Sequence, residues 1–354
     1  MKKALVAMSG GVDSSVAAKM MADKGFSCIG CTMKLYDNKE VGVKSSRTCC
    51  SLDDVEDARN IAYKLGMSYY VFNFTDDFRN TVISKFIENY EKGYTPNPCI
   101  DCNRYMKFGK LYDRAKLLNC HYLVTGHYAR IEKSDDKYIL KKALDDTKDQ
   151  SYVLYSMTQE QLAHTIFPLG DMKKSEVRAI AQQSGFINAD KSDSQDICFV
   201  PNGDYASVIE LYTGKKPTVG NFVDRQGHIL GRHKGIMHYT IGQRRGLGVS
   251  SFQPLYVCGI CPENHNVVLG NNKDLFKKEL DVSDCNWISG VTPKTEFRCK
   301  VKIRYRQVEQ WATVLPIASG KVHIVFDAPQ RAITPGQAAV WYEGDTVLGG
   351  GTIL

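Results

Sequence analysis

The sequence has no long hydrophobic run. After Met1, Lys2 and Lys3, only five apolar residues precede Ser9, which is too short for the core of a signal peptide. No later stretch approaches the roughly 20 apolar residues that a membrane-spanning helix needs. The chain also has no internal repeat and no low-complexity tract. These absences predict a cytoplasmic protein without a membrane-bound segment.

The composition is that of an ordinary globular protein, except in its cysteines. The chain has 354 residues, 43% hydrophobic and 24% charged, and this length suits two or three domains. Lys and Arg exceed Asp and Glu by 46 to 39, and the net charge of +7 is compatible with a polyanionic partner. The 12 cysteines are unusual. In a reducing compartment they stay thiols, so we expect metal ligands or catalytic groups among them rather than a disulfide framework.

The first 200 or so residues alternate short apolar runs with helical patterns. We expect strands at 3–8, 26–35, 69–74 and 121–125, and helices at 14–24, from Ser51 to Gly66, and near 76–92 and 103–118. This alternation predicts an α/β fold with a doubly wound parallel sheet, in which ligands bind at the carboxyl ends of the strands. The polar stretch 36–47 lacks periodicity and is expected to be a loop.

The sequence pattern changes beyond about residue 205. Long helical periods end, Gly and Pro become frequent, and short alternating segments follow. This pattern predicts a small linking domain and then a β-barrel. The expected domains are therefore a catalytic domain at 1–204, a central domain at 205–275 and a barrel at 276–354.

A loop rich in glycine and serine, Ser9-Gly10-Gly11-Val12-Asp13-Ser14-Ser15, joins the first predicted strand to the first helix. The glycines let the backbone close around an anion, the serines add hydroxyl groups, and the helix start favours negative charge. The loop lacks the Gly-Lys-Ser/Thr ending of a P-loop and the spaced glycines of a dinucleotide-binding fold. We therefore predict a pyrophosphate site here. The plainer alternative is a glycine-rich turn with serine caps.

This loop resembles that of the PP-loop ATP pyrophosphatases, which attach AMP to a carbonyl oxygen and release pyrophosphate. The resemblance implies a Mg²⁺ ion on the pyrophosphate, with Asp13 as a candidate ligand. A helix cap is the alternative role for that carboxylate. The residues that the resemblance places at ATP are Ala7, Met8, Ser9, Gly10, Gly11, Val12, Asp13 and Ser14, with Met33 and Gly126 near adenine and ribose.

Three cysteines stand in contexts that suit chemistry. Cys99 and Cys102 lie in Asn97-Pro98-Cys99-Ile100-Asp101-Cys102-Asn103, where prolines precede a predicted helix. A place near a helix N-terminus lowers the pKa of a thiol, which would make Cys102 a better nucleophile. Cys198 follows the polar run Ser194-Gln195-Asp196 and precedes apolar residues, which indicates a loop that enters the core.

Two plainer interpretations of these cysteines stay open. Cys198 alone could be a small buried hydrophobic residue. Cys99 and Cys102 could hold a structural zinc ion with a second pair, either Cys258 and Cys261 or the adjacent residues 49 and 50. Because the first of these pairs lies in a predicted strand at 255–261, packing is its more common role.

Further motifs make the resemblance specific. Together with the loop and the cysteine motifs, they resemble the tRNA-specific 2-thiouridylases, and the matches run from residue 4 to the final strands. The resemblance implies an ATP-dependent sulfurtransferase that converts the wobble uridine of tRNA to 2-thiouridine, with release of AMP and pyrophosphate. The motifs are Thr125-Gly126-His127-Tyr128-Ala129-Arg130, Lys148-Asp149-Gln150-Ser151-Tyr152, Ser194-Gln195-Asp196-Ile197-Cys198-Phe199 and residues 239–248.

The resemblance also implies roles for individual residues. ATP activates the O2 carbonyl of the uridine, since a carbonyl oxygen is otherwise a very poor leaving group. Cys198 carries a persulfide from a sulfur-relay protein or a cysteine desulfurase, and Cys102 is the nucleophile that helps to release the sulfur. The expected substrates are the tRNAs for Lys, Glu and Gln. The expected tRNA contacts are Asn97, Pro98 and Cys99 at the flipped base, and His127, Lys148, Asp149, Gln150, Arg304, Tyr305 and Gln337 elsewhere.

One position departs from the family pattern, because typical members carry Asp where this chain has Cys99. With Cys99, Cys102 and Cys198 the site offers three thiolates. That number suits a [4Fe–4S] cluster with one iron left open for a sulfide, and a protein persulfide is then not required. The persulfide route and the cluster route therefore both stay open.

Residues 297–306 suggest a basic strand that could bind the tRNA backbone. One face would carry five cations over roughly 26 Å, at about 3.3 Å per residue, and the other would be largely apolar. Glu309 and Asp327 could neutralise part of this face, and the basic loop 234–245 is a second candidate patch. The alternative is a barrel strand whose outer face is merely solvated. The five cations are Arg298, Lys300, Lys302, Arg304 and Arg306; Phe297, Cys299, Val301, Ile303 and Tyr305 alternate with them.

Three other functions compete with this one. A PP-loop enzyme that amidates or ligates a small metabolite needs neither the cysteines nor the basic strand. A tRNA-binding protein without catalysis does not need the serines, Asp13 and the cysteines together. An enzyme that makes 4-thiouridine shares the loop, but an RNA-binding module is then expected ahead of it, and here the loop starts at Ser9.

Overall fold

The computed structural model describes the chain except for residues 38–51, 194–196, 201–202 and 318–319. Several predicted features therefore lie outside the described residues: the N-cap at Ser51, most of the loop 36–47, the cysteines at 49 and 50, and the polar run 194–196. Within the described part, no helix has both the length and the apolar character needed to cross a membrane.

The N-terminal part is built on a parallel sheet with the strand order β3-β2-β1-β4-β7. The chain passes from β1 to β2 and β3 on one side and later adds β4 on the other side of β1. The strand order thus reverses between β1 and β4, and open α/β sheets bind ligands at such a switch point. The predicted doubly wound sheet is confirmed. Its strands are β1 (Lys3–Ala7), β2 (Ser27–Lys34), β3 (Ser68–Asn73), β4 (Tyr122–Val124) and β7 (Thr165–Ile166).

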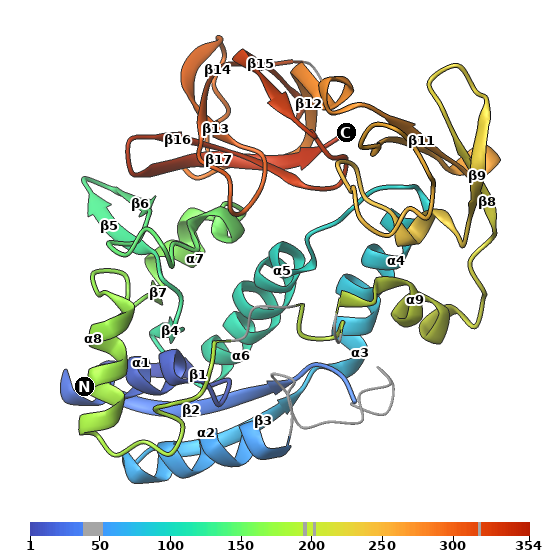
Figure 1. Ribbon diagram of the computed structural model, residues 1–354. Coiled ribbons are helices and arrows are strands. Elements are labelled where there is room, and N and C mark those ends of the chain that lie inside the picture. The colour runs from blue at the N-terminus through green and yellow to red at the C-terminus, as the bar shows by residue number, and fades with distance from the viewer. Residues whose placement is uncertain (38–51, 194–196, 201–202, 318–319) are drawn as a thin grey trace.

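Both faces of this sheet are covered by helices (Figure 1). Ala4 and Val6 of β1 belong to a core with helices α1 (Val12–Asp23), α2 (Leu52–Lys64) and α8 (Lys174–Gln183). Leu5 points the other way, into a larger core. Alternate residues of a strand face opposite sides, so a sheet buried on both faces has strands that read as continuous apolar runs. The continuous apolar run of β1 is the reason that this strand could be predicted from the sequence.

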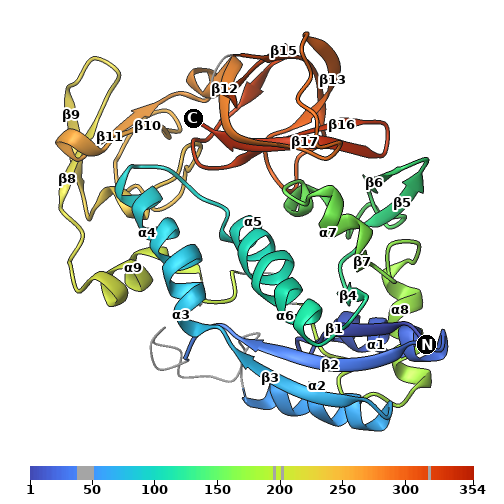
Figure 2. The same cartoon turned by 180° about the vertical axis from the view of Figure 1, so that it is seen from behind.

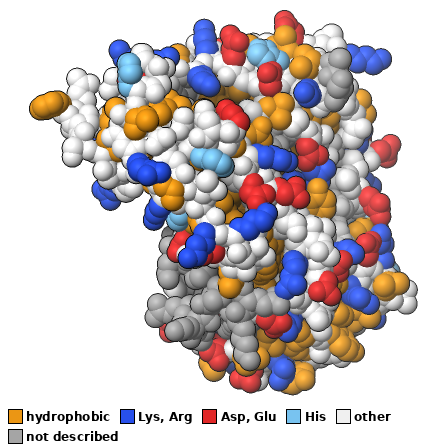
Figure 3. All heavy atoms as spheres, turned by 90° about the vertical axis from the view of Figure 1, so that its right-hand side faces the viewer, with side chains coloured by type: hydrophobic (Ala, Val, Ile, Leu, Met, Phe, Trp, Pro, Cys, Tyr) orange, Lys and Arg blue, Asp and Glu red, His pale blue; other side chains and the backbone are white. Residues whose placement is uncertain are grey.

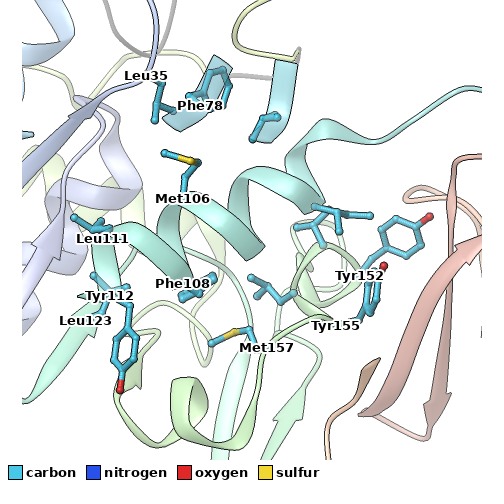
Figure 4. Close-up of a cluster of buried hydrophobic side chains, with 14 of the residues drawn as sticks. Leu35, Phe78, Met106, Phe108, Leu111, Tyr112, Leu123, Tyr152, Tyr155 and Met157 are labelled. Atoms are coloured by element: carbon cyan, nitrogen blue, oxygen red, sulfur yellow. The ribbon is translucent and has the colours of Figure 1, made fainter. Parts of the chain in front are cut away.

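The larger core surrounds a long helical segment that leads away from the sheet. Figure 4 shows its buried side chains, from Leu35 and Phe78 to Tyr152 and Tyr155 beside the C-terminal strands. Parts of the helices are wound as π-helix, a geometry often found at functional sites. The first helical stretch comprises α3 (Thr75–Phe78), η1 (Arg79–Ile83) and α4 (Ser84–Glu91), and the second comprises α5 (Pro98–Asp101), η2 (Cys102–Leu111) and α6 (Tyr112–Leu117).

A small sheet with its own core follows in the chain. Its strand order is β10-β11-β8-β9, and Phe222, Tyr239, Val257 and Val267 are buried in its core. Helix α9 (Tyr205–Thr213) precedes the sheet. The strands are β8 (Gly220–Val223), β9 (Ile229–His233), β10 (Tyr256–Cys261) and β11 (Asn266–Gly270).

The C-terminal strands form a closed antiparallel barrel, as predicted. Their order is β12-β15-β14-β13-β16-β17, and pairing of β12 with β17 closes the ring. Closure leaves no open sheet edge in this ring. A hairpin from the N-terminal part, β5 (Arg130–Ser134) and β6 (Lys137–Lys141), joins β17 through the pair Thr346 and Lys141. The barrel strands are β12 (Phe276–Trp287), β13 (Phe297–Lys302), β14 (Gln310–Pro316), β15 (Val322–Arg331), β16 (Ala338–Glu343) and β17 (Thr346–Ile353).

Hydrogen bonds join the barrel to the N-terminal part around helices η3 (Ser151–Leu154) and α7 (Gln159–Ala163). The Tyr152 hydroxyl donates to the Ala338 carbonyl at 2.8 Å, and the Asn286 amide donates to the carbonyls of Tyr155 and Met157 at 2.7 and 3.1 Å. Figure 2 shows α7 lying directly against the barrel. The remaining short helices are η5 (Ile236–His238), η6 (Pro262–Asn264) and η7 (Asn272–Leu275).

Asn286→Ala should lower the free energy of unfolding by about 1–3 kcal/mol, because it leaves carbonyls of two buried residues without their donor. Urea denaturation measures this loss. Asn60→Ala is the matched control, since Asn60 is exposed on α2, and a change within about 0.5 kcal/mol is expected there. Equal stability of the two variants would show that the Asn286 contacts contribute nothing.

Candidate active site at the switch point of the sheet

The loop Ser9–Ser15 lies at the carboxyl end of β1, at the switch point. Helix α1 begins at Val12, with Gly11 as its N-cap, and in the part of the chain that the structure describes no side chain caps its first amides. The Ser14 hydroxyl accepts a hydrogen bond from the Ser9 amide at 3.2 Å and donates to the Gly11 carbonyl at 3.0 Å. Ser15 donates to the same carbonyl at 3.0 Å. Two serines thus brace the loop, while the uncapped helix start suits an anion.

Two glycines are required where other backbone segments approach this loop. Gly10 has φ +77°, and a Cβ there would collide with the backbone of Asp54 in α2. Gly126, just after β4, lies against the start of α1, where a Cβ would be 2.8 Å from Asp13 C and Ser14 N. The structure therefore brings Gly126, which the sequence had placed near the ribose, to the predicted pyrophosphate loop.

The other residues expected at the nucleotide line the same edge of the sheet. Ala7 is the last residue of β1, and the Met8 amide donates to the Cys31 carbonyl of β2 at 2.7 Å. The Met8 carbonyl accepts from the Thr32 hydroxyl at 2.5 Å. Met33, near the end of β2, is half-buried and lies opposite Phe72 of β3.

The Asp13 carboxylate is already engaged. The Lys174 ammonium donates to both of its oxygens, at 2.6 and 2.8 Å, and the Tyr128 hydroxyl donates at 2.7 Å. The Lys174 side chain is only 11% exposed, and a buried lysine normally needs such a partner. A Mg²⁺ ion on Asp13 would have to replace or share these contacts. No pattern in the sequence pointed to Lys174, which is the first residue of helix α8.

The segment that precedes Cys198 wraps around the loop. The buried Asn188 amide donates to the Gly10 carbonyl at 2.8 Å and to the Ser15 hydroxyl at 3.0 Å. Lys191 pairs with Asp54 and Asp57 of α2. Asp193 pairs with Lys174 at 2.8 Å, with Lys148 at 2.9 Å and with Arg178 at 3.2 Å. These contacts were not predicted from the sequence, because they join separate segments of the chain; Lys148 had been expected at the tRNA instead.

The C-x-x-C motif opens the second helical stretch. The Asn97 side chain caps α5 by accepting from the Cys99 amide at 3.2 Å, with Pro98 in the first turn. Cys99 is exposed, and Cys102 follows one turn later, half-buried, where the π-helix η2 begins. The helix N-terminus that was expected near Cys102 is therefore closer to Cys99.

Both C-terminal parts hold the chain just ahead of this motif. The Thr95 amide donates to the Pro335 carbonyl at 2.8 Å, and the Gln337 amide donates to the Thr95 carbonyl at 2.7 Å. The Thr95 hydroxyl also bonds that of Thr240 at 3.3 Å. Gln337, expected at the tRNA, is thus a tether of the cysteine motif.

Cys198 sits at the start of the predicted entry into the core. Its carbonyl accepts from the Tyr36 hydroxyl at 2.6 Å. Phe199 is buried, and its ring meets those of Phe78 and Phe86 edge-on at 5.5 and 5.2 Å. Cys198 and Cys102 are both half-buried and pack against the same hydrophobic cluster. The structure thus brings both predicted sulfur cysteines to one core.

The described residues contain no group of three or more His, Cys, Asp or Glu side chains placed to hold a metal ion. Cys99, Cys102 and Cys198 are therefore not arranged as a ready-made ligand set for an iron–sulfur cluster. The zinc alternative with Cys258 and Cys261 finds no support either. Burial raises the pKa of both thiols, which suits packing in β10.

Several residues expected at the tRNA are occupied within the protein. His127 is buried, its Nδ1 lies 2.7 Å from the Thr125 hydroxyl, and burial together with Lys107 holds its pKa well below the ordinary value. Asp149 accepts from the amides of Ala143 and Ser151, both at 3.1 Å. Gln150 accepts from the Tyr128 amide at 2.9 Å.

The predicted basic strand ends earlier than expected. Strand β13 stops at Lys302, because the chain must turn before β14 begins at Gln310. Up to Lys302 the alternation holds, with Cys299 and Val301 buried. Arg298 is neutralised by Asp327 at 2.6 Å, as the sequence allowed.

Beyond Lys302 the prediction of a five-cation face is wrong. Arg304 turns inward, and its guanidinium donates to the carbonyls of Ile241 and Ala332 at 3.2 and 2.9 Å and to the Thr334 hydroxyl at 2.8 Å. It therefore ties the central sheet to the barrel. Tyr305, placed on the apolar face by the sequence pattern, is exposed, and its ring packs against that of Tyr152. Glu309 pairs with Lys142 instead of the basic strand.

Comparisons with known proteins cover the whole chain. Three family models match: the tRNA methyl transferase HUP domain at residues 2–202, the tRNA methyl transferase PRC-barrel domain at 206–271 and the aminomethyltransferase beta-barrel domain at 277–353. A protein of Clostridioides difficile named tRNA-specific 2-thiouridylase MnmA is 49% identical, over 99% of this chain and 98% of its own. One of Thermoanaerobacter pseudethanolicus, named tRNA-specific 2-thiouridylase MnmA 1, is 51% identical, over 99% and 97%. The resemblance found in the sequence is confirmed: the chain belongs to the tRNA-specific 2-thiouridylase family.

Proposed function

We propose that the protein is an ATP-dependent sulfurtransferase that converts the wobble uridine of tRNA to 2-thiouridine. Family membership supports the reaction class. The observation that carries the proposal is the combination of an uncapped helix start after β1 with two cysteines, Cys102 and Cys198, that pack against the larger core. The helix start suits the binding of pyrophosphate, and the two cysteines suit sulfur transfer.

In the proposed first half-reaction, the loop binds the phosphates of ATP. The uridine O2 attacks the α-phosphorus, pyrophosphate leaves, and O2 becomes part of an adenylate. The first amides of α1 and the exposed Ser9 hydroxyl stabilise negative charge on the departing pyrophosphate. Asp13 offers oxygen ligands of the kind that Mg²⁺ prefers, and bound Mg²⁺ would offset phosphate charge. Ala7, Met8, Met33 and Gly126 would enclose the adenosine.

In the proposed second half-reaction, sulfur replaces O2. The terminal sulfur of a Cys198 persulfide attacks C2, and AMP leaves with the original oxygen. The Cys102 thiolate attacks Sγ of Cys198, which frees the sulfur on C2 and forms a disulfide between the two cysteines. An external thiol must then reduce that disulfide. A relay protein or a cysteine desulfurase would supply the persulfide, and the expected tRNAs are those for Lys, Glu and Gln.

The persulfide route is favoured over an iron–sulfur cluster by the placement of the cysteines. Cys99 is exposed in the first turn of α5, whereas Cys102 and Cys198 pack against the larger core. The family models are described in terms of methyl transfer, but two cysteines on one core suit sulfur chemistry better. Analysis of the modified nucleoside separates the two products by mass.

Cys102→Ala and Cys198→Ala should each abolish 2-thiouridine formation in vitro, while Cys99→Ala keeps most of it. Pyrophosphate release that depends on tRNA should persist in all three variants, since the adenylylating loop is intact. Nucleoside mass spectrometry and a pyrophosphate assay measure the two steps separately. Cys258→Ala, in β10, is the matched control and should stay active.

Loss of thiolation in Cys99→Ala as well, together with iron in anaerobically purified protein, would favour the cluster route instead. Pyrophosphate release driven by a small metabolite without tRNA would support a ligase or amidase. Tight tRNA binding with no chemistry in the wild-type protein would support a binding protein without catalysis. The ligase or amidase and the binding protein therefore each have a distinguishing result.

Gly10→Ala should abolish ATP binding and pyrophosphate release, because its Cβ would force the loop away from the Asp54 backbone. Gly25→Ala is a matched control. Gly25 has nearly the same φ, +76°, but a Cβ there meets nothing within 4 Å. Both variants bear the strain of alanine at positive φ, of about 1 kcal/mol. Isothermal titration with ATP compares them, and equal loss in both would mean that backbone strain, rather than the close approach, shapes the site.

The central sheet offers a second basic surface for the tRNA. Residues 206–271 contain seven Lys and Arg against three Asp and Glu, a net charge of +4 out of the total of +7. Arg244 and Arg245 are exposed, as is Phe252. An exposed aromatic ring on a basic domain suits a nucleic acid, since bases stack on such rings. Figure 3 looks onto this side of the molecule and shows Lys and Arg side chains spread over it.

The position of this surface fits the proposed site. The loop that carries the two arginines starts at Thr240, which bonds Thr95 just ahead of the cysteine motif. Gly242 packs against Ala332 of the barrel, so the base of the loop is held in place. A tRNA whose base enters near Cys99 would therefore pass close to Arg244 and Arg245.

Arg244→Glu combined with Arg245→Glu should weaken tRNA binding at least tenfold at moderate salt. It should also lower the salt dependence of log Kd by about 1–2, the share of two phosphate contacts. Filter binding at several salt concentrations measures both effects. Lys2→Glu with Lys24→Glu makes the same charge change at exposed positions near the N-terminus, far from the central sheet in both ribbon views (Figures 1 and 2). Equal weakening by both double variants would indicate a general charge effect instead of a contact.

A further inference from the structure

Asp193 collects cations from separate segments of the chain. Its carboxylate pairs with Lys148, from the loop after β6, and with Lys174 and Arg178, from helix α8. The side chain is 24% exposed. Burial alone would raise the pKa of Asp193, but the hydrogen bonds and charges of Lys174 and Lys148 outweigh it and lower the pKa. Asp193 is therefore a carboxylate that holds three positive groups together.

One of these cations also belongs to the nucleotide loop. The Lys174 ammonium donates to both oxygens of Asp13 and to Asp193, so all three of its N–H donors are in use. Lys174 cannot strengthen its contact with one carboxylate without weakening its contact with the other. Asp13 and Asp193 therefore compete for one ammonium group.

A second cation belongs to the motif expected to contact tRNA. Lys148 is half-buried, its side chain forms an ion pair with Asp193 at 2.9 Å, and its charge also acts on Asp145. The same carboxylate thus restrains a residue of the nucleotide site, through Lys174, and a residue of the expected tRNA site. Asp193 also stands shortly before Cys198 in the chain.

We propose that Asp193 is a positioning residue that couples nucleotide binding at Ser9–Ser15 to tRNA binding at Lys148. This inference rests on the proposed function. If the Asp13 carboxylate held a Mg²⁺ ion that arrives with ATP, the Lys174 ammonium would be repelled from Asp13 and would pair fully with Asp193. With Lys174 and Arg178 bound, Asp193 releases Lys148 to a phosphate of the tRNA.

The same exchange runs in the opposite direction. A tRNA phosphate that takes Lys148 leaves Asp193 with more charge for Lys174, which moves away from Asp13. Asp13 is then open to the metal ion. Each ligand raises the affinity of the other by the same factor, as linkage requires. The enzyme would therefore bind ATP firmly when a tRNA is present, which limits adenylylation without an acceptor.

The test compares binding of the two substrates, separately and together. For the wild type, the Kd of a tRNA transcript is measured with and without Mg²⁺ and a non-hydrolysable ATP analogue. We expect the analogue to tighten tRNA binding about 5- to 50-fold, a common range for coupling between sites. In Asp193→Asn, which keeps the shape of the side chain but removes its charge, the factor should fall to about 1–2, a loss of most of this coupling.

Asp190→Asn is the matched control, because Asp190 is exposed and its recorded contact is one long hydrogen bond from Gln182, at 3.3 Å. It should keep the full coupling factor. Lys174→Met should remove the coupling from the nucleotide side, whereas Lys173→Met, at the exposed neighbouring position, should leave it unchanged. If Asp193→Asn does not fold, as judged by its thermal unfolding, the two lysine variants carry the test.

The inference is overturned if Asp193→Asn or Lys174→Met keeps the wild-type coupling factor, or if the wild type shows no coupling. These results differ from a failure of the proposed function. In that case, wild-type protein with tRNA, ATP and a persulfide donor forms no 2-thiouridine at all.

Discussion

The loop Ser9–Ser15 depends on the close approach of three backbone segments. Gly10 lies against the backbone of Asp54 in α2, and Gly126 lies against the start of α1, both too closely for a side chain. This packing leaves the first amides of α1 facing the end of the sheet with no side-chain cap among the described residues. A helix start in that state binds anions well because its amides and dipole are already oriented. These backbone contacts, together with the serine hydroxyls that brace the loop, give the switch point a geometry that suits a phosphate.

The cysteine motif is held in place in a different way. Its helical stretch leads away from the sheet, so contacts with the sheet alone would restrain only one end of it. The Thr95 carbonyl accepts a hydrogen bond from Gln337 of the barrel, and the Thr95 hydroxyl donates one to Thr240 in the central part. Arg304 locks these two parts to each other. The C-terminal parts therefore position the helix that carries the cysteine motif, in addition to any contact that they make with tRNA. Residues such as Gln337 and Arg304 can affect tRNA modification without touching tRNA.

The sequence predicted the features that depend on local pattern. The strand β1, the loop after it, and the helix that was expected to stop at Gly66 follow from apolar runs and turn chemistry, and all appear in the structure. The sequence did not reveal Lys174, Asn188 or Asp193, whose significance lies in contacts between distant segments. The strand predicted at 297–306 was also too long. The alternation continues to Arg306 in the sequence, whereas the backbone turns after Lys302. The alternation of polar and apolar residues in a sequence does not show at which residue a strand stops pairing with its neighbours.

The charges around the loop explain why so many lysines can be buried beside a phosphate site. Asp13 and Asp193 oppose Lys174, Lys148 and Arg178, so this group is close to neutral without ligand and one charge positive overall. A larger positive excess would be costly to bury in the empty site, and a group with net negative charge would repel ATP and tRNA. Sharing cations between two carboxylates resolves the conflict, since each arriving ligand replaces a carboxylate partner rather than meeting an unpaired buried charge. The shared ion pairs that stabilise the empty site are therefore the same ion pairs that, in our proposal, couple the binding of the two substrates.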